Sequence, residues 1–140
     1  MQSGNPRWTA PELLLSSISD DLKASYAEPH ILWGVPTPRC DIWSFGMTCL
    51  EIMTGKRPFS HLALDGGPIW EIYKGKRPAR PDCLVGAGSW HDNLWNLIQA
   101  CWDAKPKNRP SATAVLAALA EILGSELCKY PGIDLEVSKM

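Results

Sequence analysis

The residue types that most often carry enzyme chemistry are present in this sequence, but their spacing fits neither a metal site nor a hydrolase. The histidines His30, His61 and His91 show no HExxH or similar ligand spacing, and no serine lies in a GxSxG motif. Zinc chemistry needs ligands that converge, and acyl transfer needs a nucleophile beside its base. We therefore expect the histidines to be ordinary surface or core residues.

Positive charge is concentrated at Lys74, Lys76, Arg77 and Arg80, a small patch that could contact an anionic partner. The whole chain, however, has 14 basic and 15 acidic residues, which gives a net charge of −1. Nucleic acids and anionic membranes select for a marked positive excess. We therefore expect no nucleic acid and no membrane as partner, and we interpret the patch as a solvated loop.

Cysteine usage indicates a reducing compartment. The five cysteines are odd in number and no pair has CxxC spacing; they are Cys40, Cys49, Cys83, Cys101 and Cys128. Disulfides or a zinc site are the alternatives to free, mostly buried thiols. The first eleven residues are polar and rich in proline, so they do not resemble a signal peptide. These features predict a cytoplasmic protein.

The stretch 37–59 must position whatever site the chain contains. Thr37 can cap a helix with Pro38 at its first position, and Gly55 can end it. Its apolar residues cover nearly the whole circumference; they are Ile42, Trp43, Phe45, Met47, Cys49, Leu50, Ile52 and Met53. A helix that is apolar all round is a buried helix, and this run is shorter than the roughly 20 residues that a bilayer requires.

Other helices are predicted by a capping residue or proline followed by apolar residues at helical spacing. They cover residues 10–15, 68–73, 89–102 and 111–123. The last one has an apolar stripe that includes Leu116 and Leu123, and Gly124 is expected to end it. No segment predicts a strand, so the expected fold is all-α, with a surface excursion at 16–36.

Four short motifs follow one another in an order that resembles the eukaryotic protein kinases. The stretch 4–12 is similar to the end of an activation segment with its A-P-E motif, and 41–46, D-I-W-S-F-G, is similar to the start of the large buried helix of the C-terminal lobe. G-K-R-P at 75–78 and C-W…P…R-P at 101–110 follow in the family's order. The resemblance implies a partial kinase domain at 1–124, with a tail at 125–140.

The resemblance also implies two structural roles. The glutamate of A-P-E, here Glu12, pairs in the family with the arginine of R-P, here Arg109. A buried carboxylate needs a cation, and the planar fork of an arginine suits a carboxylate. Two unpaired surface charges would be the alternative. Asp41 corresponds to the aspartate that braces the catalytic loop in kinases.

The substrate-side loop of the family corresponds to the residues just before A-P-E. They are Gly4, Asn5, Pro6, Arg7, Trp8 and Thr9. Asn5 stands where many serine/threonine kinases have threonine, so preference for Ser/Thr or Tyr stays open. The 29 positions from Glu12 to Asp41 exceed the family's usual gap, and 16–36 is therefore interpreted as an insertion near the approach of protein substrates or partners.

The motifs that bind ATP and transfer phosphate do not occur in the sequence. There is no GxGxxG, no H-R-D and no D-F-G, so the N-terminal lobe and the catalytic loop have no counterpart here. We expect no catalytic, cofactor or metal residue in this chain, and ATP and Mg²⁺ only in a full-length parent.

Two alternatives to a kinase fragment remain at this stage. One is a non-catalytic helical interaction module derived from a kinase, and the other is an unrelated all-α bundle. With half of the lobe without a counterpart, some of Trp43, Met47, Leu50 and their neighbours are expected to face an uncovered surface. The chain alone is then expected to be marginally stable and prone to aggregate.

Overall fold

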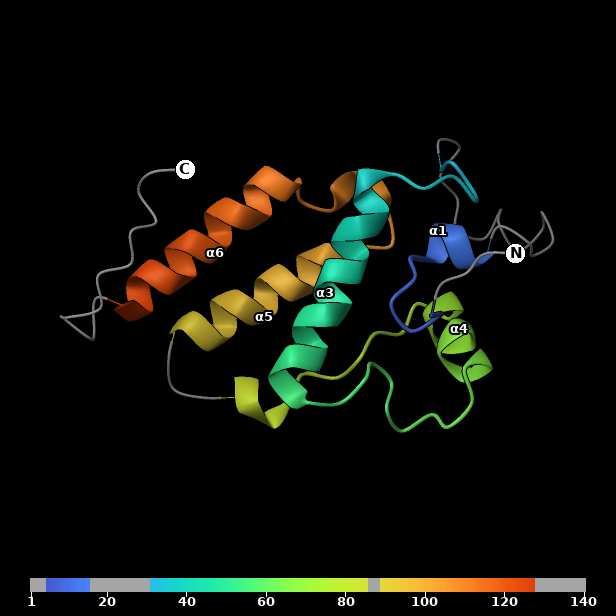
Figure 1. Cartoon of the computed structure of the whole chain (residues 1–140), viewed down its shortest axis with the longest axis horizontal. Helices are drawn as coiled ribbons and strands as arrows, with labels where there is room; N and C mark the ends of the chain where they lie inside the picture. The colour runs from blue at the N-terminus through green and yellow to red at the C-terminus, as the bar shows by residue number, and fades with distance from the viewer. Residues whose placement is uncertain (1–4, 16–30, 86–88, 128–140) are drawn as a thin grey trace.

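The structure, a computed structural model, describes residues 5–15, 31–85 and 89–127, and every regular element in these residues is helical (Figure 1). The α-helices are α1 (Pro11–Leu14), α3 (Pro38–Thr54), α4 (Gly66–Tyr73), α5 (Ser89–Cys101) and α6 (Ala112–Leu127); the 3₁₀ helices are η2 (Asp82–Leu84) and η3 (Pro106–Asn108). The expected all-α architecture is confirmed.

Helix α3 begins and ends where its sequence predicts. Thr37 has an extended backbone (φ −132°, ψ 160°), and Pro38 follows at the first helical position, where no backbone N–H is needed. Gly55 adopts the left-handed conformation (φ 64°) and donates its N–H to the Glu51 carbonyl at 2.7 Å. The side chain of Thr37 makes no capping hydrogen bond. The fixed φ of proline, more than the threonine hydroxyl, therefore sets the start of this helix.

The core lies around α3, which packs against α5 and η3. Trp43 and Met47 are fully buried and Leu50 is 4% exposed. The expectation of an uncovered surface is wrong for these three side chains, because the packing of α5 and η3 covers their side of the helix. The large apolar side chain of α3 that does face solvent is their neighbour Ile52, which is 74% exposed.

Gly46 allows α3 and α5 to approach each other closely. A Cβ atom at this position would lie 2.6 Å from Trp102 Nε1 and 2.9 Å from Cys101 Cβ. Both distances are too short for carbon in contact with side-chain atoms that are themselves packed in the core. Glycine at position 46 is therefore a condition for the position of the Trp102 indole.

Helices α5 and α6 run antiparallel, with the start of α5 beside the end of α6 (Figure 1). Ser111 caps α6, because its Oγ accepts the Ala114 N–H at 3.1 Å. The expected stop at Gly124 is wrong, since α6 continues past it. A glycine inside a helix costs only about 1 kcal/mol, and no proline follows it here. The expected boundary between 1–124 and 125–140 therefore falls inside α6.

Helix α1 lies beside α4, on the side of the molecule away from α6 (Figure 1). Helix α4 begins at Gly66, two residues before the expected Pro68. Gly75 follows its end with φ 78°, a left-handed conformation that suits glycine. The two short helices thus bring the start of the described chain against the segment that follows α3.

The predicted excursion at 16–36 lies mostly outside the described residues. Its last part, 31–36, has no regular secondary structure. It returns to α1, because the Gly34 N–H donates to the Glu12 carbonyl at 2.9 Å. The backbone of Glu12 thus binds this loop, which leaves its side chain for a separate contact.

Candidate functional site

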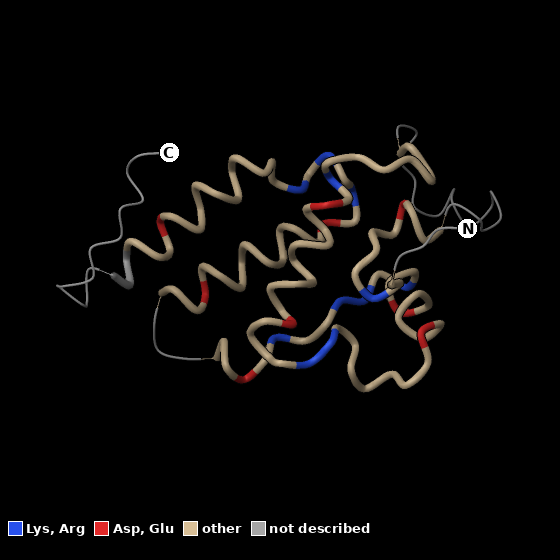
Figure 2. Tube along the Cα trace, viewed as in Figure 1, with Lys and Arg blue, Asp and Glu red and all other residues tan. Residues whose placement is uncertain are grey.

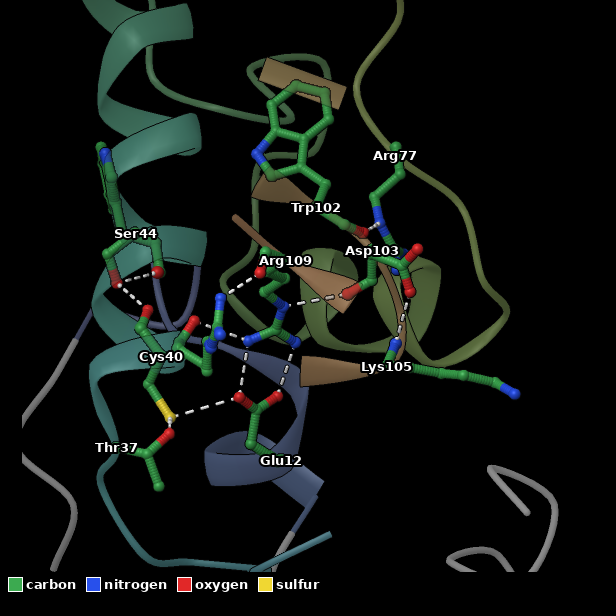
Figure 3. Close-up of polar contacts among 11 residues, drawn as sticks. Glu12, Thr37, Cys40, Ser44, Arg77, Trp102, Asp103, Lys105 and Arg109 are labelled. Carbon is green, nitrogen blue, oxygen red and sulfur yellow. Dashed lines mark hydrogen bonds and ion pairs between the residues drawn. The ribbon is translucent and has the colours of Figure 1, made fainter. Parts of the chain in front are cut away.

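The structure brings Glu12 and Arg109 together across 97 positions of sequence (Figure 3). Arg109 Nη1 lies 2.6 Å from Glu12 Oε1, and Nη2 lies 2.9 Å from Oε2. The arginine side chain is 0% exposed and the glutamate side chain 4%. Two parallel charge-assisted hydrogen bonds in a buried setting fix both the distance and the orientation of the partners.

The other polar atoms of this pair are also satisfied. Arg109 Nε donates to the Asp103 carbonyl at 3.0 Å, and Nη1 donates to the Arg39 carbonyl at 2.8 Å. Arg39 in turn donates through Nη1 to the Arg109 carbonyl. The ion pair therefore ties α1, the start of α3 and the η3 loop into one polar cluster, which we call the Glu12–Arg109 cluster.

Cys40 adds a third contact to the glutamate, since its Sγ donates to Glu12 Oε1 at 3.2 Å (Figure 3). Burial raises the pKa of the Cys40 thiol; hydrogen bonding with Thr37 opposes this, and the negative charge of Glu12 adds to it. The thiol therefore stays protonated at neutral pH, which is the form that can donate to a carboxylate. Sequence analysis did not assign this role to Cys40, because a cysteine on an apolar helix looks like a packing residue.

Two guanidinium groups lie close to the ring of Trp43. Arg77 is 4.5 Å and Arg109 5.1 Å from the centre of its ring. Arg77 also donates through Nε to the Trp102 carbonyl at 3.0 Å. Arg77, one of the two arginines of the expected basic patch, is therefore part of the packing around α3.

The other members of that patch pair with carboxylates. Lys74 and Lys76 lie 3.6 Å and 2.7 Å from the two oxygens of Glu71, and Arg80 lies 2.6 Å from Asp92. Lys74 and Lys76 thus share Glu71, Arg80 pairs with Asp92 and Arg77 contacts Trp43, so the four cations do not converge on one ligand site. Lys74 and Lys76 have the exposure expected of a solvated loop, whereas Arg77 packs against the ring of Trp43.

Arg7, a residue of the expected substrate-side loop, is fully buried. Its Nη1 donates to the carbonyls of Pro58 (3.0 Å) and Phe59 (2.8 Å), and its Nη2 donates to that of Leu62 (2.7 Å). Its Nε is 3.1 Å from the Asp65 carboxylate. Arg7 thus holds the loop between α3 and α4. The sequence did not predict this role because most partners of Arg7 are backbone carbonyls. Every residue has a backbone carbonyl, so the residue type does not identify such a partner.

The rest of the substrate-side loop is attached to α3, and Gly4 lies outside the described residues. Trp8 Nε1 donates to Glu51 Oε2 at 3.1 Å, and Ser44 Oγ donates to the Trp8 carbonyl at 2.8 Å. The Asn5 carbonyl accepts the Thr9 hydroxyl at 2.9 Å, while the Asn5 side chain is exposed. The loop is therefore bound to α3 through Trp8, whereas its Asn5 side chain faces solvent.

Asp41 lies in the first turn of α3 and is exposed. It lines a surface pocket of about 550 Å³ together with Thr9, Cys40 and Ser44. The pocket joins the start of α3 to the substrate-side loop. A carboxylate on its rim can accept hydrogen bonds from a segment that lies in the pocket.

The described residues form no cluster for a metal ion, and two of their cysteines are poor nucleophiles. No three of its His, Cys, Asp and Glu side chains are placed to hold a metal ion. His61 is exposed, and the ring of His91 lies 3.9 Å from that of Trp90. Burial raises the pKa of Cys49 to about 11 and that of Cys101 to about 12, so both stay protonated and are weak nucleophiles.

None of the described helices has the length and apolar character needed to cross a bilayer.

Comparison with known proteins gives matches to kinases. The family model described as protein tyrosine and serine/threonine kinase matches residues 2–119. The dual specificity protein kinase pyk3 of Dictyostelium discoideum is 32% identical over 126 residues, which are 89% of this chain and 8% of that protein. The dual specificity protein kinase shkD of the same organism is 32% identical over 127 residues, 86% of this chain and 13% of that protein.

A relative from an animal gives the same picture. Mitogen-activated protein kinase kinase kinase 7 of Drosophila melanogaster is 29% identical over 112 residues, which are 79% of this chain and 15% of that protein. The chain thus spans less than a sixth of the length of each of these three relatives. Their similarity to it lies within one portion of a much longer polypeptide.

Proposed function

Because this chain belongs to the protein tyrosine and serine/threonine kinase family, we propose that it forms the substrate-side part of a kinase C-terminal lobe. In this role it supports transfer of phosphate from ATP to the hydroxyl group of a protein substrate. The observation that carries the proposal is the buried Glu12–Arg109 pair, which joins the A-P-E segment to the R-P loop. The kinase names of the relatives favour this function over a non-catalytic interaction module.

The chain itself supplies position rather than chemistry. Phosphoryl transfer requires residues that hold ATP and Mg²⁺ and a carboxylate that orients the attacking hydroxyl, and the motifs for these are not in the sequence. In the proposed function ATP and Mg²⁺ bind to residues outside this sequence. By itself the described part of the chain would neither bind the nucleotide nor transfer phosphate.

Asp41 is the proposed contact with the catalytic loop. Its exposure, its place in the first turn of α3 and the pocket of about 550 Å³ beside it support this role. A carboxylate there would accept backbone N–H groups of the catalytic loop and hold that loop in one conformation.

The edge of the substrate-side loop at the exposed Asn5 and the half-buried Pro6 is the proposed contact with protein substrates. Arg7 and Trp8 hold that edge in place through the α3–α4 loop and α3.

The free thiols among the described cysteines support a cytoplasmic location.

The test joins this chain to the N-terminal part of a relative's kinase domain, up to and including D-F-G, and measures transfer of labelled phosphate from ATP to protein. We expect transfer by the fusion and none by the chain alone. In the fusion, Asp41→Ala should lower the rate by roughly tenfold or more, because a loosened catalytic loop misplaces its reacting groups. Asp82→Ala, an exposed aspartate in η2, is the matched control and should leave the rate unchanged.

Two results would contradict the proposal. One is nucleotide-dependent stabilisation or phosphate transfer by the chain alone. The other is a fusion that unfolds in a single cooperative transition but transfers no phosphate.

A further inference from the structure

An apolar groove runs along the α5–α6 pair where no described segment covers it. Its volume is about 330 Å³. Its lining side chains come from the end of α3, the start of α5 and the second half of α6; they are Met53, Trp90, Leu94, Leu119, Ile122 and Leu123. All six are apolar or aromatic, so the groove suits an apolar occupant.

The outer surface of α6 extends this apolar character. Leu123 is 56% exposed and Leu116 is 68% exposed. Glu121 is the only charged residue between Ala112 and Gly124. Figure 2 shows that α6 has fewer charged residues than the loops around α3 and α4. Large apolar side chains that gather on one helix of a soluble domain mark a surface that another segment covers.

The sequence that follows α6 has the pattern of such a segment. Ile133, Leu135 and Val137 alternate with the acidic residues Asp134 and Glu136. In an extended chain, alternate residues share one face, so these three apolar side chains would point one way and the two carboxylates the other. In an extended conformation the segment would therefore present one apolar face and one acidic face.

The chain is also long enough to bring this segment to the groove. Residues 128–132 separate it from the end of α6, and Pro131-Gly132 is a pair that favours reversal of the chain. The start of α5 and the end of α6 lie at the same end of the pair (Figure 1). Leu123 lies one helical turn, roughly 6 Å, before Leu127, whereas six extended residues reach up to roughly 20 Å.

The spacings on the two sides agree. Leu119 and Leu123 lie four residues apart on α6, a rise of about 6 Å. Successive apolar side chains of the extended segment, such as Ile133 and Leu135, lie about 6.6 Å apart. An extended segment running back along α6 can therefore place one side chain beside each leucine.

We propose that the C-terminal segment Ile133–Val137 of this chain docks in the α5–α6 groove through Ile133, Leu135 and Val137, and that it covers the apolar surface of α6. This contact is independent of the kinase function proposed above, because it involves neither the Glu12–Arg109 cluster nor the Asp41 pocket. It assigns a role to a tail that the family resemblance leaves without one.

The test is photo-crosslinking in the full chain. A benzophenone amino acid replaces Leu135 in one variant and Glu136 in the matched control, and crosslinked peptides are identified by mass spectrometry. We expect position 135 to crosslink to Met53, Leu119 or Leu123 and position 136 to give at least roughly tenfold less of these products, because its side chain points to water. A mixture of ¹⁵N-labelled and unlabelled chains distinguishes contacts within one chain from contacts between chains.

Each alternative outcome overturns the proposal. Crosslinks that join labelled to unlabelled chains would assign the groove to a second copy. Equal yields at positions 135 and 136, or no product in the groove, would show that the tail does not dock there. As a second measurement, the triple variant I133S/L135S/V137S should bind several-fold more of an apolar dye than the wild type, whereas D134S/E136S should not; equal dye binding by both would also count against docking.

Discussion

The region around the Glu12–Arg109 cluster and the α5–α6 pair hold the molecule together in different ways. The first joins α1, the start of α3 and the η3 loop through a buried ion pair, with Arg109 alone bonded to three residues. The second depends on apolar packing and leaves large side chains such as Leu116 exposed. Polar anchors specify where irregular segments lie, whereas apolar helix faces can accept any cover of suitable shape.

The largest effect should come from removing the arginine of the polar region. Arg109→Ala leaves Glu12 buried without its cation, and we expect a loss of about 3–5 kcal/mol in the free energy of unfolding. Urea denaturation followed by circular dichroism measures this loss. Lys56→Ala, which removes an exposed cation, is the control and should stay within about 0.5 kcal/mol. Equal effects for both variants would remove the distinction between the two regions.

A second anchor of the polar region should behave similarly but more locally. Arg7→Ala removes the donors to three loop carbonyls, and we expect a loss of about 2–3 kcal/mol together with faster proteolysis between α3 and α4. Arg57→Ala, an exposed arginine in the same loop, is the matched variant. If the loop is cleaved at the same rate in both, Arg7 does not hold it.

The contact between the two regions can be tested at the helix crossing. Gly46→Ala places a methyl group against the Trp102 indole, and overpacking of this kind costs about 1–3 kcal/mol. Gly66→Ala adds the same methyl group where no atom lies within 4 Å. Thermal unfolding should separate the two variants, and an identical melting temperature would mean that α3 and α5 can move apart without cost.

The smallest effect is expected on an exposed apolar side chain. Ile52→Ser should change stability by less than about 0.5 kcal/mol, because the side chain already faces solvent. The same change should reduce association of the chain, measured by sedimentation at several concentrations. Ile42→Ser, in the buried part of α3, is the control that should destabilise clearly. A large loss of stability for Ile52→Ser would show that something covers this residue.

The helical part of the fold could be predicted from sequence because it depends on local signals. Pro38 and Gly55 marked both ends of α3, and apolar spacing marked α5 and α6. The end of α6 was predicted wrongly at Gly124. A glycine ends a helix where the backbone adopts a left-handed conformation, and the residue type alone does not determine this. The sequence predicted a buried helix but not which of its side chains are covered, because the cover of Trp43 includes two arginines that are distant in sequence.

Some contacts of the candidate site were likewise predicted from the sequence, and others were not. Glu12 and Arg109 were paired through a family resemblance, since nothing local in the sequence joins two residues so far apart. The thiol of Cys40 and the carbonyl partners of Arg7 depend on three-dimensional arrangement alone. The prediction that the isolated chain aggregates stays a prediction, which the exposed side chains of Ile52, Leu116 and Leu123 make specific.

The most direct test of the account is a double-mutant cycle on the buried pair, with Glu12→Gln, Arg109→Met and the double variant compared with wild type by urea denaturation. Both single changes keep most of the side-chain volume, so the cycle reports the interaction rather than the loss of packing. We expect a coupling energy of roughly 2 kcal/mol, because each partner is buried and bonded to the other. A coupling energy near zero would contradict the claim that this ion pair joins α1 to the η3 loop.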